Sequence, residues 1–474
     1  MSHATLHATA CIGCRRRGRK CDRTLPTCLS CEKRGVACEG YVTKWPGVAA
    51  RGKLAGKSIP VADSSVAITE ASSAPTRARQ RKARLPSGST DANDNLSTGP
   101  SKEQFGDTLS SVGEDEIEKF IQHYIADLSN IFFLGNGPSD NPYFQYVLPL
   151  IDTVPSIRFA IAGAASCHIA ARTSDEALEQ KSLRLRVHAT HLLRGMLQNP
   201  SAVSDQTILA SILMLAQLDM CSGDCTEFET HLKAAAVVIR NLDYDGAANR
   251  YYFEQRLAWL DMMSSTTSNQ LPNLTTEEVK TIIGRFSSNG SREWSYDVFP
   301  CPIDLFEILA EITILIKSEE EITGSGQMEP QAERLSSRLR EWKCPRAITG
   351  PRKHMVEGWK LGITAYLRRL FPYTNHSADV VALPNQVLEL AKLIPPATSW
   401  SYSLLWPIFQ VGVTLGDEAT EEKEWIRKRL KICLESVGCR HFSNALETLE
   451  VIWGHHQPYD SCLTSMYGRT IMLA

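Results

Sequence analysis

The sequence predicts a small N-terminal module organised by cysteines, a disordered linker and a large all-α C-terminal domain. Three observations support this division. Six of the fourteen cysteines lie between Cys11 and Cys38. The following segment is rich in Gly, Ser, Ala, Thr and Pro and nearly lacks large apolar residues, so it cannot offset its ordering entropy by burial. From about residue 112, apolar residues recur at helical spacing. The predicted boundaries are 1–10 (disordered tail), 11–45 (module), 46–110 (basic linker) and 111–474 (helical domain).

Charge is distributed unevenly along the 474 residues. Residues 1–100 carry 17 Lys/Arg and 7 Asp/Glu, whereas the rest of the chain carries 34 and 46. A basic segment attached to an acidic body is typical of a nucleic-acid-binding head.

The cellular environment also follows from the sequence. The N-terminal segment MSHATLHATA has no apolar core, so we expect no secretory signal peptide. The longest uncharged run, Leu393–Gly416, contains Pro395, Pro396 and Pro407, which favours short core helices over a membrane span. We therefore expect no membrane association and a reducing compartment, where clustered thiols favour metal over disulfides.

The cysteine spacing contains an internal repeat. The pattern C-x2-C-x6-C-x6-C-x2-C-x6-C is formed by Cys11, Cys14, Cys21, Cys28, Cys31 and Cys38. Two copies of C-x2-C-x6-C predict two metal sites related by a pseudo-twofold axis. Structural zinc is four-coordinate, so two ions need about eight ligand positions and six thiolates must share two of their sulfurs. By symmetry the bridging ligands are Cys11 and Cys28. The module is then two short helices around a two-zinc, six-cysteine cluster.

Two alternatives compete with this interpretation. Three disulfides would need an exported protein, and a single four-cysteine site would leave the repeat unexplained. Two zinc ions and six thiolates leave a net charge of about −2. The cations that can neutralise it are Arg15, Arg16, Arg17, Arg19, Lys20, Arg23, Lys33 and Arg34. The module is too small to fold on an apolar core. The free energy of zinc binding, about 10–16 kcal/mol per site, must therefore stabilise it.

The segment CIGCRRRGRKCDRTLPTCLSCEKRGVAC resembles the fungal-type binuclear zinc cluster. The resemblance covers the six cysteines, the basic run Arg15–Lys20, Asp22 and Pro26. It implies a nuclear protein that binds short GC-rich elements of double-stranded DNA, often CGG triplets, and controls transcription by RNA polymerase II.

The candidate DNA-contacting residues follow Cys14 directly. They are Arg15, Arg16, Arg17, Gly18, Arg19 and Lys20. The resemblance implies a helix in the major groove, with Arg17 and the next residue facing bases. Many family members have Lys or Arg where this chain has Gly18, so one side-chain reader is missing. Main-chain carbonyls near Arg17, or the side chains of Arg16 and Arg19, could take over that contact. The alternative role for these cations is neutralisation of the cluster alone.

A second basic cluster lies in the linker. It comprises Arg77, Arg79, Arg81, Lys82 and Arg84. It is a candidate nuclear-localisation signal or a set of phosphate contacts, with a solvated charge run as the alternative. Residues 45–110 contain no heptad pattern, which opposes a coiled-coil dimer.

The body is expected to be all-α. Ile117, Phe120, Ile121 and Leu128 share one face of a first helix, whose start is acidic. Further amphipathic segments begin near Ile208, Leu305, Ile426 and Phe442, and loops are expected near 135–142, 242–248, 264–275, 289–301, 320–328 and 344–352.

The body also resembles a fungal-specific transcription factor domain. The segments FIQHYIADLSNIFFLGNGPSDNPYFQYVLPL, PSIRFAIAGAASCHIAAR, LLWPIFQVGVTLGDEATEEKEWIRKRLK and FSNALETLEVIW carry this resemblance over about 112–455. It implies a mostly helical regulatory domain that modulates the DNA-binding head through small-molecule effectors, co-regulators or the transcription machinery.

Enzymatic activity is not expected. Cys167 and His168 are neighbours in sequence, so their side chains leave a helix in different directions, and no phosphate loop, nucleophile elbow or HExxH motif is present. The competing function is a zinc-cluster co-regulator that binds proteins and no DNA, which the glycine at position 18 leaves open. RNA binding would need aromatic residues beside the basic run, and only Tyr41 and Trp45 lie near it.

Overall fold

The computed structural model describes two parts of the chain. It covers residues 10–38 except 12–13, 15, 25–27 and 37, and residues 112–473 except 136–137, 199–205, 243–247, 289–297, 318–327, 345–347, 373–382 and 456–470. The chain divides into two compact units, 1–95 and 96–474. The linker cations Arg77, Arg79, Arg81, Lys82 and Arg84 lie outside the described residues, as does Arg15.

The N-terminal unit is small and is built on cysteines. Cys14 and Arg16 are helical, and α2 (Leu29–Glu32) begins directly after Cys28 and contains Cys31. Its buried cluster consists of Cys11, Cys14, Cys28 and Cys31, with Val36 and two further cysteines packed against it. The described part of this unit therefore contains no apolar core beyond its sulfur atoms and one valine.

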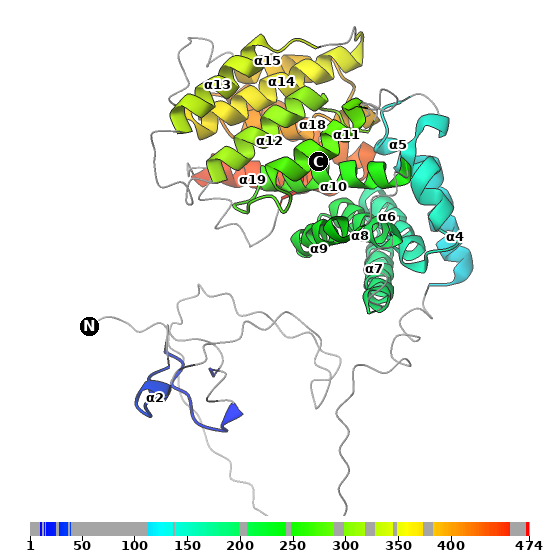
Figure 1. Cartoon of the computed structure of the whole chain (residues 1–474), viewed down its shortest axis with the longest axis vertical. Helices are drawn as coiled ribbons and strands as arrows, with labels where there is room; N and C mark the ends of the chain where they lie inside the picture. The colour runs from blue at the N-terminus through cyan, green and yellow to red at the C-terminus, as the bar shows by residue number, and fades with distance from the viewer. Residues whose placement is uncertain are drawn as a thin grey trace, which may run out of the picture. The chain divides into compact units, whose positions relative to one another are not determined.

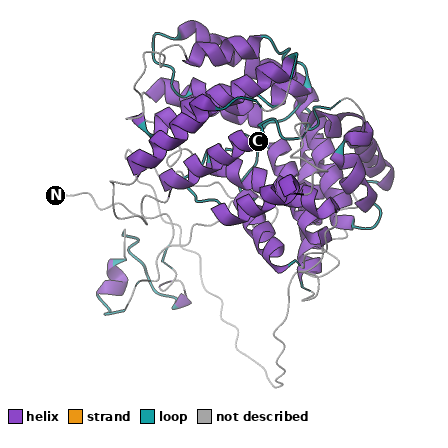
Figure 2. Cartoon of the chain, turned by 45° about the horizontal axis from the view of Figure 1, so that its top comes forward, coloured by secondary structure: helices purple, strands orange, loops and turns teal. Residues whose placement is uncertain are grey.

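Helices, joined by loops, are the regular secondary structure of the larger unit over its described residues (Figures 1 and 2). Its first half contains α4 (Glu114–His123), π-helix η1 (Tyr124–Leu128), α5 (Ser129–Ile131), η2 (Pro138–Asp140), π-helix η3 (Tyr143–Val147), η4 (Leu148–Leu150), α6 (Pro155–Thr173), α7 (Glu176–Leu197), α8 (Gln206–Ser222) and α9 (Phe228–Asn241). Its second half contains α10 (Ala248–Ser265), α11 (Thr276–Ser288), α12 (Ile303–Lys317), α13 (Met328–Glu341), α14 (Pro351–Leu370), α15 (Leu383–Lys392), α16 (Ser399–Tyr402), α17 (Leu405–Gly412), α18 (Thr420–Val437) and α19 (His441–His455). The predicted all-α fold is confirmed.

Helix α8 forms the centre of the first half. Every residue from Ile208 to Cys221 is buried, because α8 is apolar on all sides and contacts α6, α7, α9, α10 and α19. A helix of this kind belongs inside a core. Helix α7, in contrast, begins with a capping residue at the surface: Asp175 Oδ1 accepts hydrogen bonds from Ala177 N (2.8 Å) and Leu178 N (3.2 Å).

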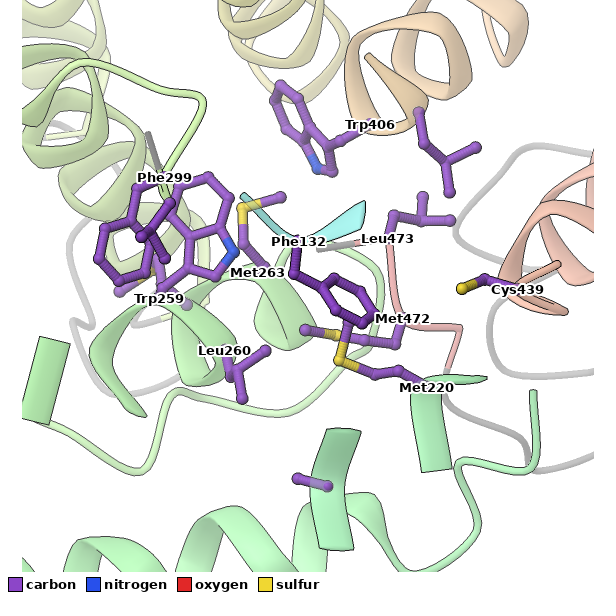
Figure 3. Packing of buried hydrophobic residues seen from close by; sticks show 14 of the residues in the cluster. Phe132, Met220, Trp259, Leu260, Met263, Phe299, Trp406, Cys439, Met472 and Leu473 are labelled. Atoms are coloured by element: carbon purple, nitrogen blue, oxygen red, sulfur yellow. The ribbon is translucent and has the colours of Figure 1, made fainter. Parts of the chain in front are cut away.

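Aromatic rings fill the second half of the unit. The rings of Trp359 (α14) and Trp406 (α17) are parallel, with centroids 5.1 Å apart and an interplanar angle of 4°. Trp259 (α10) lies beside Phe299 in Figure 3, at a centroid distance of 5.6 Å. Both buried indole N–H groups of the parallel pair have acceptors, Ser403 O (2.9 Å) and Thr266 Oγ1 (2.8 Å) respectively. The two stacked indoles thus combine ring packing with satisfied N–H donors.

The first predicted helix differs from the structure in one respect. The apolar face from Ile117 to Leu128 predicts one continuous α-helix, whereas the chain widens into a π-turn at Tyr124. In the uncharged run after Leu393, the prediction of short core helices is confirmed by α16 and α17.

Among the described residues, no single helix is long and apolar enough to cross a bilayer; one pair, Tyr143–Leu150 with Pro155–Thr173, would satisfy length and composition only together and is bent by 118°.

The His441 imidazole at the start of α19 makes the stability of this unit depend on pH. His441 is buried without a side-chain hydrogen-bond partner, and the backbone of Met220 only partly opposes the effect of burial on its pKa. Burial lowers its pKa to about 3. The pKa of His441 in the folded protein lies below the ordinary histidine pKa of the unfolded chain. Between about pH 6.5 and pH 3, His441 is therefore protonated in the unfolded state and neutral in the folded state. The contribution to stability is complete above pH 6.5 and is lost as the pH falls.

We therefore predict that His441→Leu flattens the acid side of the stability profile. The wild-type free energy of unfolding should fall more steeply below pH 6.5, by up to about 1.4 kcal/mol per pH unit. Urea unfolding followed by tryptophan fluorescence measures this unit, since every tryptophan except Trp45 lies in it. Phe442→Leu is the control, because a packing defect lowers stability without changing the slope. Equal slopes in wild type and His441→Leu would show that the imidazole is not the titrating group.

Candidate zinc centre and nucleic-acid interface

The six N-terminal cysteines form two overlapping groups of four. One group is Cys11, Cys14, Cys21 and Cys28, and the other is Cys11, Cys28, Cys31 and Cys38; the sulfur atoms within each group lie within 4.8 Å of one another. The two groups share Cys11 and Cys28, the pair that the ligand arithmetic selects as bridges.

The sulfur spacing fits metal coordination. Within the first group, Cys14 Sγ lies 3.8 Å from Cys28 Sγ, and within the second, Cys11 Sγ lies 3.7 Å from Cys31 Sγ. Ligands held tetrahedrally at about 2.3 Å from zinc lie about 3.8 Å apart, whereas disulfide sulfurs are about 2.05 Å apart. All described cysteines of the chain are free thiols.

Three hydrogen bonds of the first half of the cluster recur at the matching positions of the second half. A shift of 17 residues relates the first half to the second. The matched pairs are Cys11 N to Cys21 Sγ and Cys28 N to Cys38 Sγ (both 3.4 Å), Cys14 N to Cys11 Sγ (3.4 Å) and Cys31 N to Cys28 Sγ (3.3 Å), and Arg19 N to Cys14 O (2.9 Å) and Val36 N to Cys31 O (3.2 Å). The backbone therefore repeats the duplication that the cysteine spacing shows. Donors aimed at sulfur stabilise the thiolate form that metal binding needs.

Burial makes these thiols hard to ionise without a cation. Burial raises the pKa of Cys11 and Cys28 and raises that of Cys31 to about 12. Burial also acts to raise the pKa of Cys21. Hydrogen bonds from the backbone N–H groups of Cys11 and Arg23 outweigh this effect and lower the pKa to about 7. Ionising six close and mostly buried thiols costs free energy unless positive charge lies beside them. Two bound dications would supply that charge and hold the sulfurs as thiolates.

Asp22 joins the two halves of the module. Its Oδ1 accepts from Thr24 Oγ1 (2.6 Å) and Leu29 N (3.1 Å), while its Oδ2 accepts from Ser30 N and from Ser30 Oγ (2.6 Å). These donors, from Ser30 first and Thr24 second, hold the pKa of the carboxyl well below its usual range. Because Leu29 and Ser30 are the first residues of α2, Asp22 satisfies the free N–H groups at its N-terminus.

The role of Asp22 was not predicted from the sequence. The signal available there was the short spacing to Thr24, which is typical of an Asx-type turn, and the unsatisfied N–H groups expected where α2 begins.

The basic run lies on the surface of the first half. Arg16, Arg17, Arg19 and Lys20 are exposed. Gly18 divides the run with a backbone φ of +61°, in the left-handed region where a side chain is strained. This explains the missing side chain at position 18, because the chain reverses there, as it does at Gly35 (φ +63°) in the other half.

One cation covers the cluster from the opposite half. Arg34 Nη1 lies 3.7 Å from Cys14 Sγ, and its Nη2 donates to Lys20 O at 3.3 Å. Arg34 thus belongs to the second half of the repeat but covers a sulfur of the first half. Arg17 and Arg19, in contrast, are exposed, and neither forms an ion pair with a described acidic residue.

Comparison with known families agrees with this geometry. Residues 9–45 match the fungal Zn(2)-Cys(6) binuclear cluster domain, and residues 119–472 match the fungal specific transcription factor domain. The chain belongs to the fungal-specific transcription factor family. No curated protein and no solved structure matches the chain significantly.

This fungal transcription factor binds two zinc ions through its binuclear cluster domain, as the ligand arithmetic predicts. The two matched domains make it a DNA-binding regulator of transcription. Both predicted resemblances are confirmed.

Cys167 of the helical unit is a buried packing residue. Burial raises the pKa of Cys167 to about 12, and His168 is held by His123 Nε2 (2.8 Å) and by the carbonyl of Val437 (2.7 Å). Since Val437 O can only accept, His168 Nε2 is the donor and its Nδ1 accepts from His123. The imidazole is thus engaged on both sides and is not paired with the Cys167 thiol as a base.

We predict that Asp22→Ala accelerates loss of zinc. Without the carboxylate, the first N–H groups of α2 lose their acceptor and Cys31 loses its fixed position. Release of zinc to a colorimetric chelator should be several-fold faster than in the wild type. Glu32→Ala, which removes an exposed carboxylate from the same helix, is the control and should leave the rate unchanged. Identical rates for Asp22→Ala and wild type would show that this carboxylate does not hold the module together.

Proposed function

We propose that this transcription factor reads GC-rich, CGG-like elements at promoters transcribed by RNA polymerase II, in the nucleus. The observation that carries the proposal is the exposed basic run on a turn fixed by the first cysteine pair. The sites we assign are zinc ligation by the six cysteines, with Cys11 and Cys28 bridging, and DNA contact by residues 15–20. The genes it controls belong, on this proposal, to a metabolic or secondary-metabolite biosynthetic set.

The cations on the two sides of Gly18 are assigned different contacts with DNA. Arg17 precedes the left-handed residue Gly18 and Arg19 follows it, so the two guanidinium groups leave the backbone on either side of a reversal. A guanidinium can donate two hydrogen bonds to O6 and N7 of guanine, whereas contact with phosphate carries no sequence information. We assign base reading to Arg17 and backbone contacts to the other members of the run.

The other parts of the chain have supporting roles in this proposal. The linker cations Arg77, Arg79, Arg81, Lys82 and Arg84 serve nuclear import. The helical domain, 111–474, binds co-regulators, the transcription machinery or a small-molecule effector. Whether such a partner is bound affects the DNA-binding module through the linker 46–110. No membrane takes part.

We predict that Arg17→Ala weakens binding to a CGG-containing duplex by roughly 10- to 100-fold and weakens binding to a scrambled duplex much less. A gel shift on both duplexes measures this, with Lys33→Ala, an exposed cation of the other half, as the control. Chelator should abolish the wild-type shift, because the module needs zinc to fold.

Two results would oppose the proposal. Equal losses on the two duplexes would assign Arg17 to phosphate alone. Absence of any zinc-dependent shift across GC-rich duplexes would favour a co-regulator that binds proteins and not DNA.

A further inference from the structure

The helical unit contains a buried arginine without a counter-charge. Arg256, on α10, is 3% exposed, and its Nη2 has no hydrogen-bond partner. No carboxylate among the described residues forms an ion pair with it. Leaving a charge unpaired in a protein interior is costly, so such a group needs an explanation.

The polar groups around Arg256 share one chemical property. The guanidinium interacts electrostatically with Tyr124, Tyr143, Tyr252 and Tyr402. The hydroxyls of Tyr143 and Tyr252 are buried and have no partner besides each other. Tyr124 donates its hydroxyl to Gln217 Oε1 at 3.2 Å, which leaves Gln217 Nε2 without an acceptor. Each of these unsatisfied groups can donate a hydrogen bond, and none of them brings a negative charge.

These groups come together from separate elements. Tyr124 and Tyr143 are the first residues of the π-helices η1 and η3, and Gln217 comes from α8. The ring of Tyr143 lies 6.3 Å from Tyr124 and 6.0 Å from Tyr252, centroid to centroid. π-Turns are uncommon and occur frequently at functional sites.

An apolar wall borders the same place. The Phe132 ring is 6.2 Å from Tyr143 and 5.0 Å from Tyr402, and Figure 3 shows it beside Met220 and Met472. Aromatic and thioether side chains therefore lie next to the tyrosines, so a ligand held by the donors would also contact apolar surface.

The protonation states agree with a site made of donors. Burial raises the pKa of Tyr252 and Tyr402 well above the usual range, so their hydroxyls stay protonated. Arg256 also stays charged at neutral pH, because a guanidinium loses its proton only at a far higher pH. A buried water could satisfy some of these donors but would leave the charge uncompensated. An anion satisfies both.

We propose that the core of the helical domain binds a monovalent anion, the carboxylate of a small organic acid or an inorganic ion, between Arg256, Tyr143, Tyr252 and Gln217. This deepens the effector role assigned to the domain in the proposed function and rests on it for its regulatory meaning. The site itself lies in a unit separate from the DNA-binding module, so binding can be measured without DNA.

Thermal unfolding of the full, zinc-loaded chain tests the proposal. Sodium chloride, nitrate, acetate and benzoate are each titrated to 100 mM at constant ionic strength with sodium sulfate. The wild-type unfolding temperature should rise saturably, by several degrees, with at least one monovalent anion. Arg256→Met should abolish this response. Arg429→Met is the matched control, because Arg429 is also buried but donates to Ile394 O (2.7 Å) and Ser401 Oγ (3.1 Å); it should keep the response.

The outcomes separate the two sources of anion. A response to acetate or benzoate alone identifies an organic acid, and a response to chloride or nitrate alone identifies a structural ion; either supports the site. The proposal is overturned if no monovalent anion stabilises the wild type, or if Arg256→Met responds as the wild type does.

A second variant keeps the test decisive if Arg256→Met does not fold. Tyr252→Phe keeps the ring and the arginine but removes one donor, and it should raise the anion concentration at half-response several-fold. An unchanged concentration overturns the proposal. A failed gel shift with an intact anion response would remove the proposed DNA recognition and leave this site in place.

Discussion

Six sulfur atoms held at contact distance are the constraint on which the N-terminal unit depends. Cys11, Cys14, Cys28 and Cys31 are its buried residues, and among the described residues no apolar core replaces them. Buried thiols of raised pKa do not ionise without nearby positive charge. The two zinc ions of the family supply that charge, so metal binding and folding of this module are a single event.

The same constraint sets the surface that meets DNA. Each cysteine pair begins a helical turn, and each turn ends at a left-handed glycine, Gly18 or Gly35. The repeat thus presents two similar turns, but only the first has a continuous basic run. In the second, Arg34 reaches back to Cys14 Sγ. A repeated scaffold therefore carries an uneven distribution of charge, with four exposed cations, Arg16, Arg17, Arg19 and Lys20, on the first turn.

Local patterns in the sequence predicted much of this architecture. Ligand arithmetic needs only the spacing of the cysteines, and amphipathic periodicity needs only the period of apolar residues, so both were accessible. The π-turns at Tyr124 and Tyr143 were not, because an apolar face looks the same through a widened turn. The acceptor role of Asp22 depends on donors up to eight residues away in a folded loop. The isolation of Arg256 is a tertiary property, since nothing in its surrounding sequence separates it from a surface arginine.

Metal analysis of the purified full chain, combined with titration of its reactive thiols, tests the central claim most directly. The account predicts two zinc atoms per chain, with the six N-terminal cysteines released as free thiols only when the metal is removed. One zinc atom or none, with these cysteines oxidised to one another, would contradict it.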